Sequence, residues 1–201
     1  MNLAPDPQPV LDFWFGAGDA AAILQRNGVR WWRADAAFDA EIRERFGALR
    51  DRALAGALDA WHATPRGTLA LILLIDQFSR NLFRGDARAF AHDALARSWT
   101  RTLLARGTDR ILAPVERVFC YLPLEHAEDL PTQERSVALL TALRDEAPPD
   151  LRDAFENFLD FARKHHDVIA RFGRFPGRNA ALGRVSTAEE TEFLKQPGAA
   201  F

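Results

Sequence analysis

The sequence is short of residue types that would point to particular classes of protein. It has a single cysteine, Cys120, so no disulfide forms within the chain and a reducing compartment is favoured. Cys120 lies in an apolar run and is expected to be buried. Lys164 and Lys195 are the only lysines among 26 basic residues. With 28 acidic residues the formal net charge is −2, so there is no general basic field for nucleic acid.

Long apolar runs are also missing. The longest, LALILLI at residues 69–75, has seven residues, against the roughly 20 that a membrane-spanning helix needs. The N-terminal segment MNLAPDPQPV has neither the basic start nor the apolar core of a signal peptide. The sequence therefore predicts a soluble, cytoplasmic protein with neither a membrane nor a nucleic-acid partner.

Strand signals are equally scarce, whereas helical ones recur along the chain. No segment alternates apolar and polar residues, and no Asn-Gly or Asp-Gly pair joins two strand-like runs. Residues 35–56 open with a capping Asp35 and stop at Gly56. Between them, apolar residues recur every three or four positions, as in an amphipathic helix: Phe38, Ile42, Phe46, Leu49 and Ala53.

Residues 64–85 form the expected central helix. Thr64 is its cap and Pro65 its first residue, and two turns are apolar on every side. Further helices are expected at about 86–106, at 113–126 with a kink or break at Pro123, at 130–147, at 150–172, and from Ser186, where Glu189 has capping-box spacing. We expect a single all-α domain over residues 1–201, with an irregular segment at 1–9. Antiparallel helical pairs would make it tetratricopeptide-like or α-solenoid-like, although no clean repeat of about 34 residues is present.

Charged residues follow the apolar side of the central helix. Leu69, Leu73, Asp76, Arg80 and Arg84 are spaced four, three, four and four residues apart, and so lie along one side. Asp76 precedes Arg80 by four residues, the favourable order for a helical ion pair. If partly buried, this pair would hold Arg80 ready for an external anion, with Asn81 beside it. The alternative is an ion pair that only ties helices together.

A second arginine cluster lies in the segment ARFGRFPGRN, residues 170–179. Four arginines occur between Arg171 and Arg184 without an acidic residue. Guanidinium groups match carboxylates and phosphates bidentately, so Arg171, Arg174 and Arg178 are candidates for anion binding. Phe172 and Phe175 would anchor the segment in the core. Bracing by carboxylates of other helices is the alternative.

Two histidines are candidates for proton transfer near these arginines. His165 lies on the apolar stripe of the helix at 150–172, and His126 follows Glu125 in the segment YLPLEHAED. A histidine beside anion-holding arginines suits acid/base chemistry on an anionic substrate. The alternative is a structural histidine whose hydrogen bonds are satisfied within the core.

Four segments together resemble the bacterial family known as domain of unknown function 924: VLDFWFG, LALILLIDQFSRNLFRG, YLPLEHAED and HHDVIARFGRFPGRNAALGR. The resemblance implies an all-helical, tetratricopeptide-like fold and no established activity. In many members, a proline stands where this chain has Ser79 and a histidine where it has Gly177. The family segments include Asp76, Gln77, Arg80, Asn81, Arg84, His126, His165, Arg171, Arg174, Arg178 and Asn179.

These observations leave three hypotheses of function. The first is a binder or hydrolase-type enzyme for an anionic small molecule, with His126 and His165 as proton carriers and Glu125 joining the ligand-binding residues. The second is a helical scaffold for a peptide or partner protein, served by LDFWF and the pair Trp31–Trp32. The third, a metal-dependent phosphohydrolase, rests only on the His-Asp pairs at 92–93 and 166–167. We therefore expect neither a metal nor a cofactor.

Overall fold

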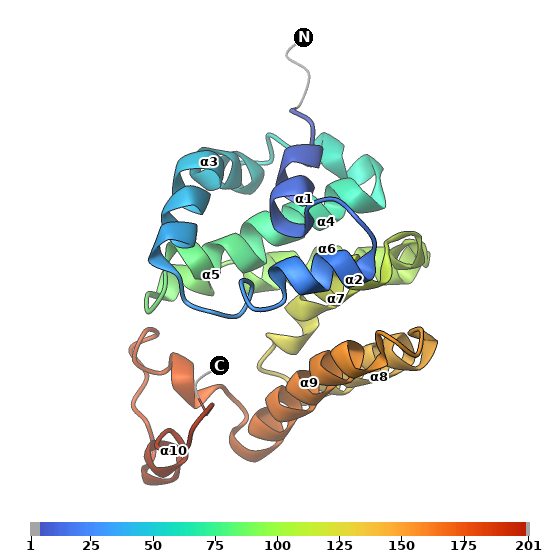
Figure 1. The fold of residues 1–201 in the computed structure, drawn as a ribbon. Coiled ribbons are helices and arrows are strands. Elements are labelled where there is room, and N and C mark those ends of the chain that lie inside the picture. Colours follow the sequence, from blue (N-terminus) through green and yellow to red (C-terminus); the bar gives the residue numbers. More distant parts are fainter. Residues whose placement is uncertain (1–4, 200–201) are drawn as a thin grey trace.

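The structure is a computed structural model that describes residues 5–199, and these residues contain helices and no strand (Figure 1). The all-α prediction is confirmed. The N-terminal half contains α1 (Gln8–Phe15), α2 (Ala20–Asn27), α3 (Ala36–Leu54), α4 (Pro65–Ile72), α5 (Phe78–Leu82) and α6 (Asp93–Arg106). The rest contains α7 (Pro114–Glu125), α8 (Leu130–Glu146), α9 (Arg152–Phe172) and α10 (Ala188–Phe193). Short 3-10 turns lie at Asp59–Ala63, Ala87–Ala89, Thr108–Ile111 and Pro176–Arg178.

The predicted helix starts at Asp35 and Thr64 are confirmed. The Asp35 carboxylate accepts hydrogen bonds from the backbone N–H groups of Ala37 and Phe38. The Thr64 hydroxyl accepts one from Gly67, and Pro65 is the first residue of α4. Each cap satisfies amide groups that a helix leaves without partners in its first turn.

The central helix contains a wide turn that its sequence did not reveal. Leu73–Gln77 is π-helical, and the Phe78 N–H donates to the Leu73 carbonyl, five residues back. This turn lies between α4 and α5, and it brings Asp76 and Gln77 to a buried position. π-helical turns are rare and often occur at functional sites.

Other predicted boundaries were wrong by a few residues. The helix expected at 86–106 begins only at Asp93, because Asp86 caps a separate 3-10 turn. The last helix is capped by Thr187 with Glu190, one residue later than predicted. The irregular segment expected at 1–9 ends sooner, since α1 starts at Gln8; residues 1–4 of that segment lie outside the described chain.

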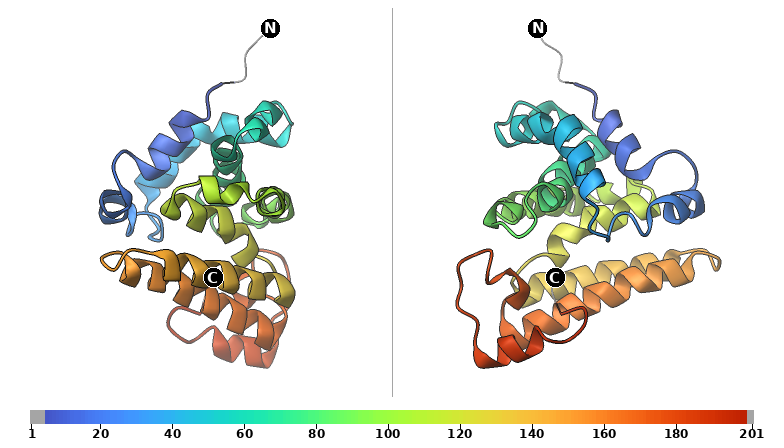
Figure 2. Two further views of the ribbon diagram at one scale, coloured as in Figure 1. Left: turned by 90° about the vertical axis from the view of Figure 1, so that its right-hand side faces the viewer. Right: turned by 60° about the vertical axis from the view of Figure 1, so that its left-hand side comes forward.

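The second half of the molecule is built on a long helical hairpin. α7 continues through Pro123 and ends two residues later at Glu125, so the expected disruption is the end of this helix. α8 and α9 then run side by side, joined by residues 147–151, and lie below α1–α7 (Figure 2). α9 ends where predicted, at Gly173, whose φ of +69° suits glycine.

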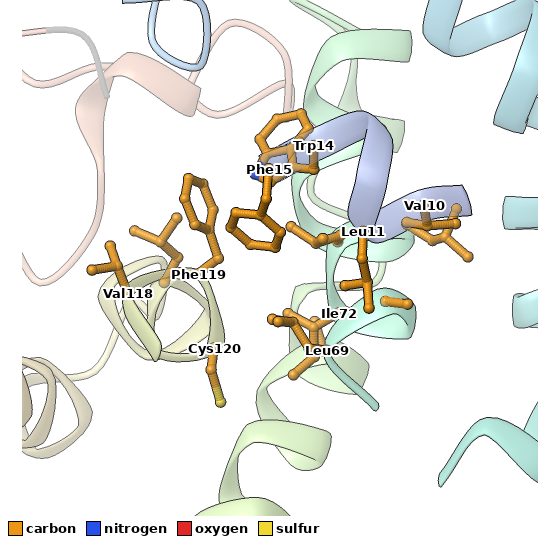
Figure 3. Packing of buried hydrophobic residues seen from close by; sticks show 14 of the residues in the cluster. Val10, Leu11, Trp14, Phe15, Leu69, Ile72, Val118, Phe119 and Cys120 are labelled. Carbon is orange, nitrogen blue, oxygen red and sulfur yellow. The ribbon is translucent and has the colours of Figure 1, made fainter. Parts of the chain in front are cut away.

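The N-terminal aromatic motif packs in the core. Figure 3 shows Trp14 and Phe15 of α1 between α4 and α7, beside Phe119. Trp31 is buried as well, with its ring centroid 4.6 Å from that of Phe119. Cys120 is buried, as expected, and burial raises the pKa of its thiol far above the ordinary range. Within residues 5–199, no helix has both the length and the apolar character to cross a bilayer.

Candidate functional site

A pocket of about 580 Å³ lies between the N-terminal helices and the α7–α9 region. Its walls come from segments far apart in the chain: the α2–α3 connection, the end of the central helix, the α5–α6 connection, α7, α9 and the segment after α9. Eight of the sequence-predicted site residues line it: Gln77, Arg80, Asn81, Arg84, Glu125, His126, His165 and Arg178. The remaining lining residues are Trp31, Trp32, Gly85, Ala89, Phe90, Val118, Leu122, Phe158, Phe161, Gly177 and Ala181.

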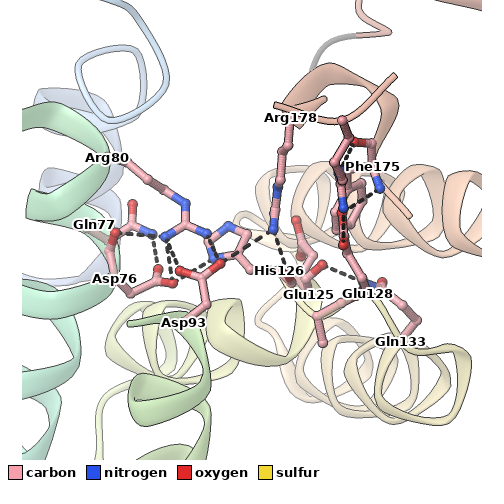
Figure 4. A network of polar contacts seen from close by, with 12 residues as sticks. Asp76, Gln77, Arg80, Asp93, Glu125, His126, Glu128, Gln133, Phe175 and Arg178 are labelled. Atoms are coloured by element: carbon pink, nitrogen blue, oxygen red, sulfur yellow. Dashed lines mark hydrogen bonds and ion pairs between the residues drawn. The ribbon is translucent and has the colours of Figure 1, made fainter. Parts of the chain in front are cut away.

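Arg80 is held by two carboxylates at the pocket wall (Figure 4). Its Nη1 donates to Asp76 Oδ1 at 3.0 Å, which is the ion pair that the spacing predicts. It also forms a bidentate pair with Asp93, at 3.0 and 2.9 Å. Asp76 is fully buried. Burial alone would raise the pKa of Asp76, but Arg80 and His126 hold it well below its usual range.

His126 is oriented by Asp76. The Nδ1 atom lies 2.8 Å from Asp76 Oδ1. Because this carboxylate is ionised and can only accept, Nδ1 carries the proton and donates it. Burial, supported by Arg80, lowers the pKa of His126 despite Asp76 nearby, so the ring is neutral at pH 7. Its other nitrogen, Nε2, has no hydrogen-bond partner among the described residues and can accept a proton.

Glu125 and His165 form a second buried pair, and both members are neutral at pH 7. Burial, with Asp76 nearby, raises the pKa of Glu125 to about 8. Burial, with His126 nearby, lowers the pKa of His165 to about 3. His165 Nδ1 lies 2.8 Å from the Phe161 carbonyl oxygen and 3.2 Å from Glu125 Oε1. Since a carbonyl only accepts, Nδ1 is the protonated nitrogen here too.

Arg178 is buried with an incomplete set of partners. Its side chain is 5% exposed, and its guanidinium lies over Phe175 and Phe90, at 4.3 and 4.8 Å from the ring centroids. Nη1 donates to the His126 carbonyl at 3.1 Å and to Asp93 at 3.4 Å. The Nε atom is buried and has no hydrogen-bond partner in the described part of the chain. Burial, with Arg80 nearby, lowers the pKa of Arg178 to about 10, so it stays charged.

The other arginines of the segment 170–179 are paired away from this pocket. Arg171 contacts Glu189 at 2.8 Å, and Arg174 forms a bidentate pair with Glu190 at 2.6 and 2.8 Å. Asn179 is buried and donates to Glu190 as well. The arrangement of these residues matches the bracing alternative.

Two residues at the pocket mouth also have protein partners. Arg84 forms a bidentate pair with Asp39 of α3, at 2.6 and 3.0 Å. Asn81 donates to the same carboxylate at 2.8 Å. Both side chains therefore tie the central helix to α3 while they line the pocket.

Sequence reasoning missed several residues of this site. Asp93 was considered only with His92 as a metal pair, whereas its carboxylate lies between Arg80 and Arg178. Asp93 could be recognised as a site residue only from its place at the first turn of α6, and the sequence did not predict where that helix begins. Glu128 accepts hydrogen bonds from Arg184 and from the Phe175 amide, and so fixes the segment that carries Arg178. In the described residues, no three histidine, cysteine or acidic side chains gather as a metal site.

Comparisons with known proteins agree with this fold. Residues 10–198 match the family described as bacterial protein of unknown function (DUF924). A solved structure of a protein of unknown function from Agrobacterium tumefaciens is 36% identical, with a TM-score of 0.79 over 94% of this chain and 96% of that one. No match was found among the curated proteins. Gly177 lies in the pocket lining. The chain belongs to the DUF924 family.

Proposed function

We propose that the protein binds an anionic small molecule in this pocket, with Arg178 as the principal donor and His126 beside it. The observation that carries the proposal is the buried, unpartnered Nε–H of Arg178. Four buried side-chain nitrogen or oxygen atoms of the described residues have no hydrogen-bond partner, and Arg178 Nε is the one that belongs to a pocket-lining residue. An unsatisfied buried donor costs about 1–3 kcal/mol, and more when it is charged.

The distribution of charge supports the same ligand. Asp76 and Asp93 both contact Arg80 at about 3.0 Å, whereas within residues 5–199 Arg178 has one carboxylate contact, at 3.4 Å. The positive charge of Arg178 is therefore less well balanced by nearby carboxylates than that of Arg80. A carboxylate or phosphate oxygen placed at Nε would complete its partners with a charge-assisted hydrogen bond. Glu125 is neutral at pH 7 and would not repel this anion.

The pocket also has the groups for hydrolase-type acid/base chemistry. His126 Nε2 accepts a proton while Asp76 holds the ring by Nδ1, the arrangement of a general base with an orienting carboxylate. The pocket therefore suits enzymatic processing of the bound anion as well as binding.

A helical scaffold for a peptide or partner protein is the second candidate. It is favoured by Trp32 and Phe161, which line the pocket and are 50% and 49% exposed. In a tetratricopeptide-like groove these rings would contact a peptide, and Arg178 would bind its terminal carboxylate.

A thermal-shift screen against carboxylates, phosphate esters, nucleotides and divalent metals tests the proposal, with Arg178→Gln beside the wild type. An anion present at about 100 times its dissociation constant should stabilise the wild type by roughly 2.7 kcal/mol, a shift of a few degrees. Arg178→Gln should lose this shift. Arg171→Gln, which changes an arginine of the same segment outside the pocket, should keep it.

Two results of this screen would count against an anion site. In the first, an anion shifts Arg178→Gln as much as the wild type. In the second, no compound shifts the wild type while Arg178→Gln simply melts at a lower temperature. Arg178 would then be a brace between the two halves of the molecule.

A further inference from the structure

We infer that the ligand is an amphipathic monoanion: a carboxylic acid whose carboxylate lies at Arg178 and whose apolar chain lies against Trp32 and Phe161. The inference rests on the proposed function and names its ligand class. It is carried by the apolar side chains of the pocket, which the anion proposal leaves without a role.

The pocket changes from polar to apolar in the same direction along two helices. On α7, Leu122 and Val118 precede His126 by one and two turns; on α9, Phe161 and Phe158 precede His165 in the same way. With a rise of about 1.5 Å per residue, the apolar side chains begin about 6 Å from the histidines and extend to about 12 Å. The pocket therefore has a polar end and an apolar end.

Contacts between the helices show that the two polar ends lie together, as do the two apolar ends. The His126 and His165 rings are 6.3 Å apart at the polar end. At the other end, Trp32 stacks on Phe119 of α7 at 5.8 Å and meets Phe158 of α9 at 6.2 Å. Both helices thus contribute to one polar-to-apolar axis.

Exposed aromatic surface marks the apolar end as the place for a ligand chain. Trp32 and Phe161 both line the pocket, and each residue keeps about half of its surface exposed. Removing such apolar surface from water is favourable in proportion to the area covered. A volume of about 580 Å³ also exceeds what a bare acetate or phosphate ion would fill.

Charge decides between a monoanion and a phosphate dianion. Arg80 is already engaged by two carboxylates and Arg84 by Asp39, so among the described pocket-lining residues Arg178 is the cation without a close anionic partner. One added negative charge pairs with this guanidinium. A second would lie near Asp76 and Asp93 without a cation of its own, which low-dielectric surroundings penalise. The carboxylate is therefore the better head group.

The test is a calorimetric titration of the full chain with acetate, butanoate, hexanoate and octanoate, and with 1-octanol and octyl phosphate as matched probes. From butanoate onward, affinity should rise by up to roughly fourfold per methylene, the factor that corresponds to about 0.8 kcal/mol. Octanoate should bind at least about tenfold more tightly than 1-octanol, since a charge-assisted hydrogen bond is worth that much or more. It should also bind more tightly than octyl phosphate, whose second negative charge would lie near Asp76 and Asp93 without a cation of its own.

Variants separate the two ends of the pocket. Trp32→Ser and Phe161→Ser should flatten the dependence on chain length and leave the affinity for butanoate nearly unchanged. Arg178→Gln should weaken every acid by a similar factor. Ile111→Ser is the control, because Ile111 is also exposed, at 69%, and lies outside the pocket lining. This variant should change neither the dependence of affinity on chain length nor the affinity for any acid.

The outcomes distinguish this inference from the proposal beneath it. If the acids bind through Arg178 but their affinity does not depend on chain length, the anion site stands and the amphipathic class is wrong. If octyl phosphate binds through Arg178 and no acid does, the anion site stands and the carboxylate class is wrong. If neither the acids nor octyl phosphate bind, both fail. A short peptide with an apolar C-terminal residue that binds more tightly than octanoate would overturn the inference in favour of a peptide groove.

Discussion

Replacing Arg80 by methionine is expected to lower the free energy of unfolding by about 3–5 kcal/mol. The change fills the same space but leaves Asp76 and Asp93 without the cation that contacts both at about 3.0 Å. Both carboxylates are buried, so water cannot replace the lost partner. Urea denaturation at pH 7, followed by circular dichroism, measures the difference.

Two further variants make this expectation specific. Arg171→Met removes a cation from an ion pair in which both side chains are at least half exposed, and should cost less than about 1 kcal/mol. Adding Asp93→Asn to Arg80→Met should recover part of the lost free energy of unfolding, because it removes one of the two buried carboxylates that Arg80 no longer pairs with. Equal costs for Arg80→Met and Arg171→Met would contradict the buried network.

Glu125→Gln should remove a loss of stability that the wild type suffers as the pH rises from about 6.5 through 8. The pKa of Glu125 is about 8 in the folded protein and about 4.3 in an unfolded chain. Between these values the folded state binds one proton more than the unfolded state, so stability falls as pH rises. The pKa values of His126 and His165 are lowered in the folded protein, so these two histidines make stability rise with pH, but only below about pH 6.5. Above that pH the contribution of Glu125 remains, and it lowers the free energy of unfolding by about 2 kcal/mol between about pH 6.5 and pH 9.

The comparison with the wild type isolates this carboxyl group. Cys120, whose pKa is also raised, reduces stability at alkaline pH equally in both proteins and cancels in the difference. Glu189→Gln, a change at an exposed carboxylate, should leave the wild-type pH profile intact. Parallel profiles for the wild type and Glu125→Gln between about pH 6.5 and about pH 9 would show that Glu125 is ionised in the fold.

Local signals in the sequence predicted the helix starts and the ion pair within one helix. Caps such as Asp35 and Thr64, and the stop at Gly173, depend on residues within one turn of each other. The Asp76–Arg80 pair likewise follows from a spacing of four residues. These particular features need no knowledge of the tertiary structure and occur as predicted, whereas the local signals at Asp86 and Ser186 misplaced two other helix starts.

Which partner each arginine of the segment 170–179 contacts, in contrast, depends on tertiary structure. Within ten residues of chain, Arg171 lies on the last turn of α9, Arg174 follows the reversal at Gly173, and Arg178 ends a 3-10 turn. These changes of direction send the first two to Glu189 and Glu190, and the third into the pocket. The π-helical turn is a similar case, because no residue pattern in Leu73–Gln77 distinguishes it from an α-helix.

The most direct test of the anion site is the NMR signal of the Arg178 Nε–H group, assigned by its loss in Arg178→Gln and followed during titration with octanoate. If Arg178 donates its unpartnered Nε–H to the ligand, its proton resonance should move downfield and saturate with the binding curve. The Arg171 signal, outside the pocket, should stay in place. An Arg178 signal that remains still while octanoate binds would place the ligand elsewhere and leave this guanidinium a structural brace.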